Sequence, residues 1–296
     1  MGKHDVRSGA RTALLTAAAM LGFAANSLLC RAALRGGTVD PASFTAIRLC
    51  TGACVLVAIV TARGASVRRE GTWTSALVLA VYAIAFSYAY MRIGASAGAL
   101  ILFGSVQLTM IIGGLLRGER PSPLQWLGWL VAVSGLVTIN APGLDPPPPT
   151  GAGLMCSAGV AWGIYSLRGR GITRPLVATA GNFARSVPIA GLFVALAFAT
   201  GAHASAKGIA LAAASGAIAS GVGYSLWYAA MPMLGATRAA AVQLSVPVIT
   251  ALAAGVLLAE PLRLVLALGG AAIVGGLALA LARPRRSRSA STSPTR

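Results

Sequence analysis

The chain has 296 residues, of which 56% are hydrophobic and 10% charged, and its mean hydropathy is +0.77. These values exclude an ordinary water-soluble domain. The net charge of +18 does not indicate nucleic-acid binding, because no basic patch is interleaved with aromatic residues on a soluble element.

About 20 apolar residues, each rising ~1.5 Å along a helix, are needed to cross a hydrocarbon core of ~30 Å. Windows of that length predict ten membrane-spanning helices. They cover residues 11–34, 41–62, 74–91, 96–116, 123–141, 149–168, 175–200, 207–230, 235–258 and 261–282. The connections are short and rich in Gly, Pro and Arg, so no soluble domain with its own core is expected. The sequence therefore predicts an all-α polytopic membrane protein.

Lysine and arginine are distributed unequally along the predicted spans. A cytoplasmic N-terminus puts 17 of the 24 basic residues in cytoplasmic segments and four on the opposite side. This positive-inside asymmetry predicts that residues 1–10 and the C-terminus lie in the cytoplasm and that the chain crosses a bacterial inner membrane. The first apolar run has full span length, so we expect an uncleaved helix there rather than a signal peptide. The basic tail, residues 283–296, has no hydrophobic period and is predicted to be disordered.

An internal repeat divides the chain. A shift of 141 residues aligns the segment from Gly94 with the segment from Gly235 without a gap, and both segments end in glutamate, at Glu119 and Glu260. Weaker matches continue into the earlier helices. Each half holds five helices, an odd number, so the second half must enter the membrane from the opposite side. We predict two inverted repeats, residues 11–141 and 149–282, joined by a Pro-rich linker at 142–148, with a substrate site near the midplane.

These features resemble a known family. Ten spans in two five-helix halves, a Gly-Ala opening of the fourth and ninth helices and a Gly-Glu or Ala-Glu ending resemble the EamA-type members of the drug/metabolite transporter (DMT) superfamily, over residues 11–282. The resemblance implies metabolite transport, and the family includes exporters of amino acids, among them aromatic-amino-acid exporters of the YddG type. In one departure, Val106 stands where the second half has Pro247, so a symmetric kink is not implied.

Polar residues within the spans are candidates for substrate binding. Gln107 and Gln243 lie near the middle of their helices, where an unpartnered amide costs ~1–3 kcal/mol. Each must face a partner, water or a ligand, and an interhelical hydrogen bond is the alternative to a binding role. Pro247 removes a backbone donor and frees the carbonyl of Gln243, which predicts a kink or gating point with a polar niche. Ser245 is a further binding candidate beside it.

Aromatic residues divide by depth. Those near predicted helix ends fit an interfacial belt: Trp73, Trp126, Trp129, Tyr88, Tyr90, Trp227 and Tyr228. Tyr82, Phe103, Trp162 and Tyr224 lie deeper, where they either stack against a substrate or pack the core. Asn26 and Tyr165 occupy equivalent positions in the two halves, and we expect both to face one cavity.

Charged residues within the spans are few. Arg48 and Arg185 are candidate ligands for a substrate carboxylate, although snorkelling or bonding to carbonyl groups is the alternative. All six acidic residues fall in tails, loops or helix ends, and Glu119 and Glu260 are expected to make contacts there. A buried-acid proton relay is therefore not expected. The four cysteines show no metal-ligand spacing and are predicted to be packing residues, so we expect neither a metal nor a cofactor.

The sequence predicts an exporter of small metabolites, chiefly aromatic and other apolar amino acids, that works by alternating access and is facilitative. Its partners are a small-molecule substrate and the lipid bilayer, with no nucleic acid, and a monomer is compatible with the sequence. The alternative is a multidrug or lipophilic-cation efflux transporter, which usually carries an embedded acid. No HExxH, GxSxG or paired intramembrane acids indicate an enzyme. The sequence leaves open a non-transporting scaffold, the physiological substrate, the direction and the coupling ion.

Overall fold

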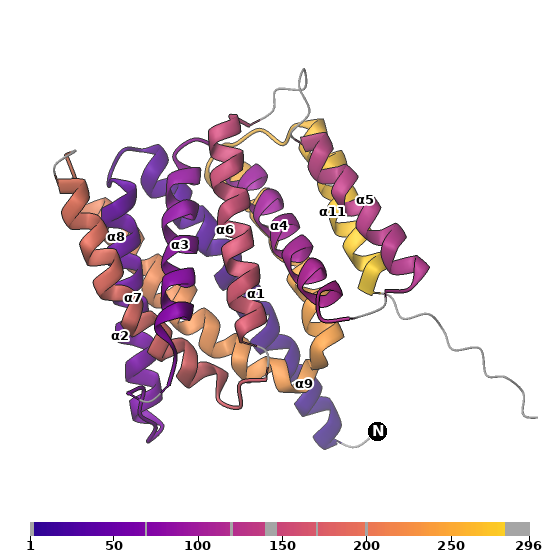
Figure 1. The fold of residues 1–296 in the computed structure, drawn as a ribbon, viewed down its shortest axis with the longest axis horizontal. Coiled ribbons are helices and arrows are strands. Elements are labelled where there is room, and N and C mark those ends of the chain that lie inside the picture. The colour runs from indigo at the N-terminus through magenta and orange to yellow at the C-terminus, as the bar shows by residue number, and fades with distance from the viewer. Residues whose placement is uncertain are drawn as a thin grey trace, which may run out of the picture.

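The computed structural model describes residues 3–68, 70–118, 121–139, 147–169, 171–198 and 201–281. In these residues, all regular secondary structure is helical apart from one isolated bridge between Val39 and Ala204, and short connections join the helices. The elements are α1 (Lys3–Arg35), α2 (Pro41–Ala62), α3 (Trp73–Tyr90), α4 (Ala95–Leu115), α5 (Pro123–Ile139), α6 (Pro149–Arg168), α7 (Pro175–Phe198), α8 (Ala206–Ala214), the π-helix η1 (Ser215–Val222), α9 (Gly223–Gln243), α10 (Ser245–Leu257) and α11 (Leu264–Leu281) (Figure 1). Six helical stretches in the described residues are long and apolar enough to span a membrane, and Ser245–Leu257 and Leu264–Ala280 are shorter apolar helices.

Local sequence determines where several helices begin and end. Asp40 caps α2, since its Oδ1 accepts hydrogen bonds from the backbone N–H groups of Ala42 and Ser43, each at 3.0 Å. Pro41 follows at the first helical position, where its missing N–H costs nothing. Beyond the other end of α2, Gly64 has φ of +72°, a left-handed conformation that ends a helix readily at glycine. These caps explain why most predicted boundaries lie within a few residues of the observed ones.

The boundary predicted between the spans at 207–230 and 235–258 lies too early in the chain, although the two helices are separate. α8, η1 and α9 form one continuous helix from Ala206 to Gln243, and the break comes at Leu244. Residues 231–243 are rich in Ala, Leu and Met, which favour helix, and Pro232 alone does not end it. The break lies directly after Gln243, the residue whose carbonyl group Pro247 leaves without a donor, so it is where a kink caused by Pro247 is expected. Pro247 is the third residue of α10, where a backbone N–H would have no intrahelical acceptor.

Equivalent helices of the two halves pack against each other: α2 with α7, α4 with α10 and α5 with α11. Figure 1 shows α5 and α11 side by side at one edge of the molecule. Glycines make this close approach possible, because a Cβ atom at Gly276 would lie 2.5 Å from the backbone N of Ala132 and 2.5 Å from the carbonyl oxygen of Gly128. Gly135 and Gly269 meet in the same way. The pairing joins the two halves along their matching helices.

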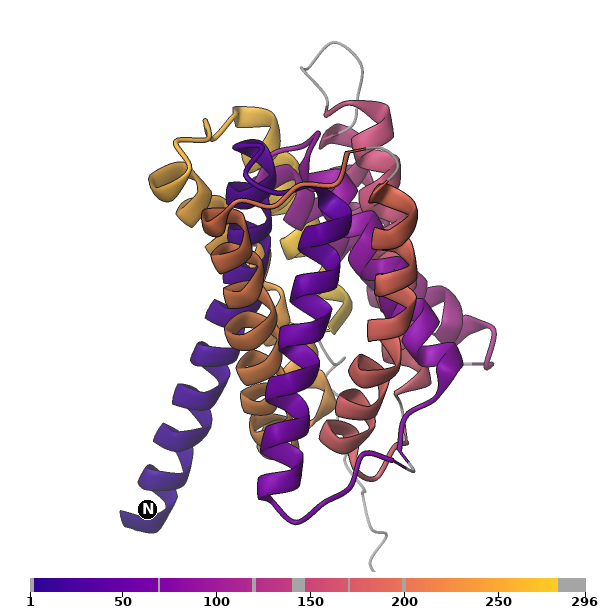
Figure 2. The same cartoon turned by 90° about the vertical axis from the view of Figure 1, so that its left-hand side faces the viewer.

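The outer surface is apolar and the interior is closely packed. Leu14, Leu192 and Val256 are 72%, 64% and 84% exposed, as suits side chains that face lipid. Phe44, Phe86 and Phe183 are among the large side chains that are fully buried between helices. Figure 2 shows α1 and α2 running lengthwise through the molecule, with the N-terminus at one end. These two helices therefore cross the molecule from end to end.

Candidate functional site

A cavity of about 780 Å³ lies between the two halves. α1, α3, α4, α6, α7, η1, α9 and α11 all contribute to its walls. At one end it reaches Pro121 in the α4–α5 connection and the exposed Gly171 and Ile172 in the α6–α7 connection. At the other end it stops at the buried Ser27 and Phe86. Among the described residues, the exposed part of the lining therefore lies at the end of the molecule where the N-terminus lies (Figure 1).

Aromatic rings form the central wall. The Trp162 ring centroid lies 4.9 Å from that of Tyr82, 5.4 Å from that of Tyr165 and 5.6 Å from that of Tyr224. The rings of Tyr165 and Tyr224 are nearly parallel to the Trp162 indole, with interplanar angles of 23° and 22°. Trp162 and Tyr165 share one face of α6 because they are three residues apart. The stack gives a planar apolar substrate several ring faces to contact.

A few hydrogen-bonding groups interrupt this apolar wall. Asn26 accepts a hydrogen bond from Ser215 Oγ at 2.7 Å, and Asn182 Nδ2 donates to Tyr165 Oη at 3.1 Å. Thr179 and Tyr228 hydroxyls lie 3.0 Å apart. None of the described residues that line the cavity is charged. The wall thus offers ring faces, hydroxyls and amides rather than ion pairs.

Eight of the nine residues predicted to bind substrate lie on the cavity wall. They are Asn26, Tyr82, Phe103, Gln107, Trp162, Tyr165, Tyr224 and Gln243. Their role in binding stays a prediction. Ser245 does not line this cavity, because it begins α10 after the break, lies in a groove beside α1 and donates its hydroxyl to the Val242 carbonyl at 2.7 Å. Pro247 is buried and is not part of the wall either.

The two arginines within the spans differ. Arg185 does not reach the cavity, since its guanidinium donates to the carbonyl oxygens of Glu70 at 2.6 Å, Gly181 at 3.0 Å and Arg68 at 3.1 Å. Arg185 therefore follows the predicted alternative, in which the guanidinium bonds to carbonyl groups. It is not placed to bind a substrate carboxylate in this cavity. Arg48 is 1% exposed and lies directly behind the wall, where it contacts Tyr82 and Ser220.

The interfacial belt predicted for seven aromatic residues holds only in part. Trp73 and Trp126 are 61% and 48% exposed, as a lipid-facing ring should be. Tyr90 is fully buried, and Trp129, Trp227 and Tyr228 line the cavity. The last two were misplaced because α9 continues past residue 230, so they are not at a helix end. Their spacing of three and four residues from Tyr224 places them on its helix face and was the signal that could have found them.

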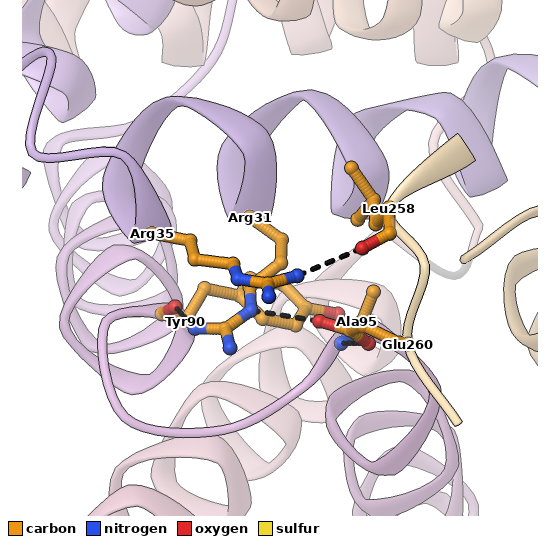
Figure 3. A network of polar contacts seen from close by, with 6 residues as sticks. All are labelled: Arg31, Arg35, Tyr90, Ala95, Leu258 and Glu260. Carbon is orange, nitrogen blue, oxygen red and sulfur yellow. Dashed lines mark hydrogen bonds and ion pairs between the residues drawn. The ribbon is translucent and has the colours of Figure 1, made fainter. Parts of the chain in front are cut away.

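Polar contacts join three helices and a loop at the closed end of the cavity. Glu260, in the α10–α11 connection, accepts hydrogen bonds from Arg31 Nε at 2.9 Å and from the backbone N–H of Ala95 at 2.7 Å. Arg31 also donates to the carbonyl oxygen of Tyr90 at 2.7 Å (Figure 3). The Arg31 and Glu260 side chains are only 14% and 10% exposed. The Glu260 carboxylate thus accepts hydrogen bonds from a backbone N–H group at the N-terminus of α4 and from an arginine of α1. Glu119, its counterpart in the repeat, lies outside the described residues.

The same end carries a second link between the halves, from the α1–α2 connection to the α7–α8 connection. Asp40 Oδ2 accepts a hydrogen bond from the backbone N–H of His203 at 2.8 Å, and the N–H of Asp40 donates to the His203 carbonyl at 2.9 Å. Partial burial would raise the pKa of the Asp40 carboxyl, but hydrogen bonds from Ser43, His203 and Ala42 outweigh burial and lower it. The closed end is therefore tied at two places.

The four cysteines form no disulfide bond. Cys30, Cys50, Cys54 and Cys156 are all free thiols. No group of three or more His, Cys, Asp or Glu side chains that could hold a metal ion occurs in the part of the chain that the structure describes.

Comparison with known sequences decides the family. The profile of the EamA-like transporter family matches residues 10–141 and matches again over residues 149–282. The chain belongs to the EamA-like transporter family. A Pseudomonas aeruginosa relative, "Uncharacterized protein PA1977", is 50% identical to this family member over 281 residues, which cover 95% of this chain and 97% of the relative. A protein of known crystal structure is 23% identical, with a TM-score of 0.66 over 91% of this chain and 96% of its own, and it supports the fold alone.

Family membership gives the cavity its context. This EamA-family protein is a multi-pass membrane protein with two family repeats, and the cavity lies where the repeats meet. A cavity between repeats, open at one end and tied shut at the other, is the geometry expected of a transporter's substrate site.

Proposed function

We propose that this protein exports small metabolites across the bacterial inner membrane, above all amino acids with aromatic or other apolar side chains. The cavity carries the proposal: its volume of about 780 Å³ is that of a small-molecule site, and its wall is built around the Trp162 stack. Because the cavity wall offers aromatic ring faces and few polar groups, it suits substrates with a range of apolar side chains. The apolar part of the substrate lies against Trp162 and Tyr224, and its polar groups bond to the amides and hydroxyls of the wall.

The two unlike ends of the cavity support a mechanism of alternating access. The end near the N-terminus is open, and the end tied by Arg31 and Glu260 is closed. With the N-terminus in the cytoplasm, as the asymmetry of basic residues predicts, this is an inward-open arrangement that loads substrate from the cytoplasm. Export requires this state to alternate with one in which the Arg31–Glu260 end opens and the other end closes.

Transport is facilitative in this proposal. The described residues on the cavity wall include no Asp or Glu, so they offer no carboxylate that would exchange a proton for substrate. The carboxylate of Glu260 lies at the closed end and is held by Arg31 and Ala95. Substrate moves down its own gradient.

A cavity variant with a matched control tests the proposal. In liposomes loaded with phenylalanine or tryptophan, the Trp162→Leu, Gln243→Ala double variant should raise the half-saturating concentration by roughly tenfold, the size of one or two lost aromatic contacts. The control is Trp73→Leu, since Trp73 is 61% exposed on the outer surface and should leave efflux unchanged. Unaltered efflux in the double variant would exclude this cavity as the route.

A lipophilic cation could also bind aromatic faces through cation–π contacts. Efflux of a quaternary ammonium compound, with no efflux of any amino acid, would replace this proposal with the multidrug alternative. The same liposomes serve for both measurements.

A further inference from the structure

A buried arginine lies behind the closed end of the cavity, and no carboxylate of the described residues is among the groups that act on it. Arg48 is on α2 and is 1% exposed. Its Nη2 donates to Tyr82 Oη at 3.1 Å, and its Nε donates to Ser220 Oγ at 3.4 Å. Nη1 has no hydrogen-bond partner. The guanidinium carbon lies 5.3 Å from the ring centroid of Tyr82 and 5.1 Å from that of Phe86.

The charge of Arg48 is not balanced within the described residues. The described carboxylates with known positions are engaged elsewhere: Asp40 caps α2, Glu70 lies 3.8 Å from Arg174, and Glu260 pairs with Arg31. Ring faces and two hydroxyls compensate a buried guanidinium only in part, and such a charge is costly unless an anion approaches it. An anion entering the cavity is the compensation that the fold leaves available.

A π-helical segment and a close helix–helix contact lie next to Arg48. η1 is a π-helical segment, which is rare and frequent at functional sites, and it interrupts the α8–α9 helix beside α2. At Gly216 an added side chain would collide with the Arg48 carbonyl oxygen and with Thr51 Oγ1, so the absence of a side chain lets the two helices meet. Ser220 lies on the same segment and reaches Arg48 Nε. The π-helix and the glycine together bring a cavity-lining hydroxyl to the guanidinium.

The direction of these hydrogen bonds determines what the cavity offers. Nε and Nη2 form one edge of the planar guanidinium, the edge that holds the two oxygens of a carboxylate in bidentate pairs. Here the edge is occupied by the oxygens of Ser220 and Tyr82, which accept from Arg48. Each hydroxyl therefore keeps its own hydrogen to donate, and both residues line the cavity. Polarisation by the arginine makes them stronger donors.

We infer that Arg48, acting through Tyr82 and Ser220, makes the closed end of the cavity a receptor for a carboxylate. The substrate class is then a zwitterionic or anionic carboxylate with an apolar side chain, held with its carboxylate toward Arg48 and its side chain against Trp162. Organic cations are repelled from this end. Arg48 is a specificity-determining residue that acts through two hydroxyls, and the inference rests on the proposed function.

Paired substrates that differ only in the carboxylate test the inference. Phenylalanine and phenylalaninamide are compared in liposomes carrying the wild-type protein, and the concentration of half-maximal efflux is measured for each. We expect the amino acid to be preferred about 10- to 100-fold, the ratio that one lost hydrogen bond to a charged group gives. Arg48→Gln should abolish the preference by weakening phenylalanine alone, whereas Arg185→Gln, with its side chain on loop carbonyls, should keep it.

A second variant keeps the test decisive if Arg48→Gln fails to fold. The Tyr82→Phe, Ser220→Ala double variant removes only two hydroxyls and leaves Arg48 in place, and it should also lose most of the preference. Equal efflux of both compounds by the wild type, or a preference that survives in the hydroxyl variant, would overturn the inference but leave the proposed export standing. Efflux of neither compound would instead overturn the proposed function.

Discussion

Replacement of Glu260 by alanine is predicted to loosen the closed end of the cavity. The substitution removes the acceptor of two charge-assisted hydrogen bonds, from Arg31 Nε at 2.9 Å and from the N–H of Ala95 at 2.7 Å. Both charged side chains are largely buried, at 14% and 10% exposure, so solvent weakens the pair little. Loss of one partner of a buried pair costs about 3 kcal/mol or more, and this shifts the equilibrium between closed and open forms of this end about 100-fold.

Cysteine accessibility measures that shift. Ser96 is 2% exposed and lies in the small pocket lined by Arg31 and Glu260. A Ser96→Cys variant, with the four native cysteines replaced, should react slowly with a membrane-impermeant maleimide and much faster after Glu260→Ala. Glu70→Ala is the control, because Glu70 forms only an exposed contact with Arg174 at 3.8 Å, of a kind that contributes about 0–1 kcal/mol. An unchanged labelling rate, or an equal rise with Glu70→Ala, would refute the reasoning.

Two further predictions concern stability. Gly276→Ala should destabilise the folded protein by about 1–3 kcal/mol, because the new Cβ atom would lie 2.5 Å from backbone atoms of α5, and the melting temperature in detergent should fall. Gly275→Ala is the control, because its Cβ atom would meet nothing within 4 Å, and it should not lower the melting temperature. Equal melting temperatures would contradict the close α5–α11 packing. The folded-state pKa of Asp40 is lowered, so its stabilising contribution is present above the unfolded-state pKa of about 4 and is lost as pH falls through the folded value. The melting-temperature gap between wild type and Asp40→Asn should thus stay constant above about pH 5 and shrink as the pH falls below about 4, and a gap that stays constant there would disprove it.

Much of the fold could be predicted because membrane helices leave a strong signal. Apolar length located most helices within a few residues, and depth within the span identified Tyr82, Trp162 and Tyr224 as inward-facing. The failure was local: the helix that was predicted to end at residue 230 continues to Gln243, since the Ala-rich stretch there favours helix. Ser245 was misassigned for this reason, because orientation around a broken helix does not follow from depth alone.

The contacts at the closed end of the cavity could not be predicted from the sequence. Arg31 and Glu260 are 229 residues apart, and neither position indicates its partner. Arg48 was found as a candidate from its depth, but its unpartnered Nη1 and its contact with Ser220 depend on the π-helix at Ser215–Val222. Such features arise from tertiary packing rather than from periodicity.

Efflux from liposomes that contain the purified protein and one loaded amino acid tests the central claim most directly. Phenylalanine, tryptophan, methionine, threonine, lysine and glutamate are compared with no ion gradient and again with an imposed proton gradient. The account predicts saturable efflux that favours the aromatic and apolar amino acids and is unaffected by the proton gradient. Efflux of none of them would contradict amino-acid export, and efflux only with the gradient would contradict a facilitative mechanism.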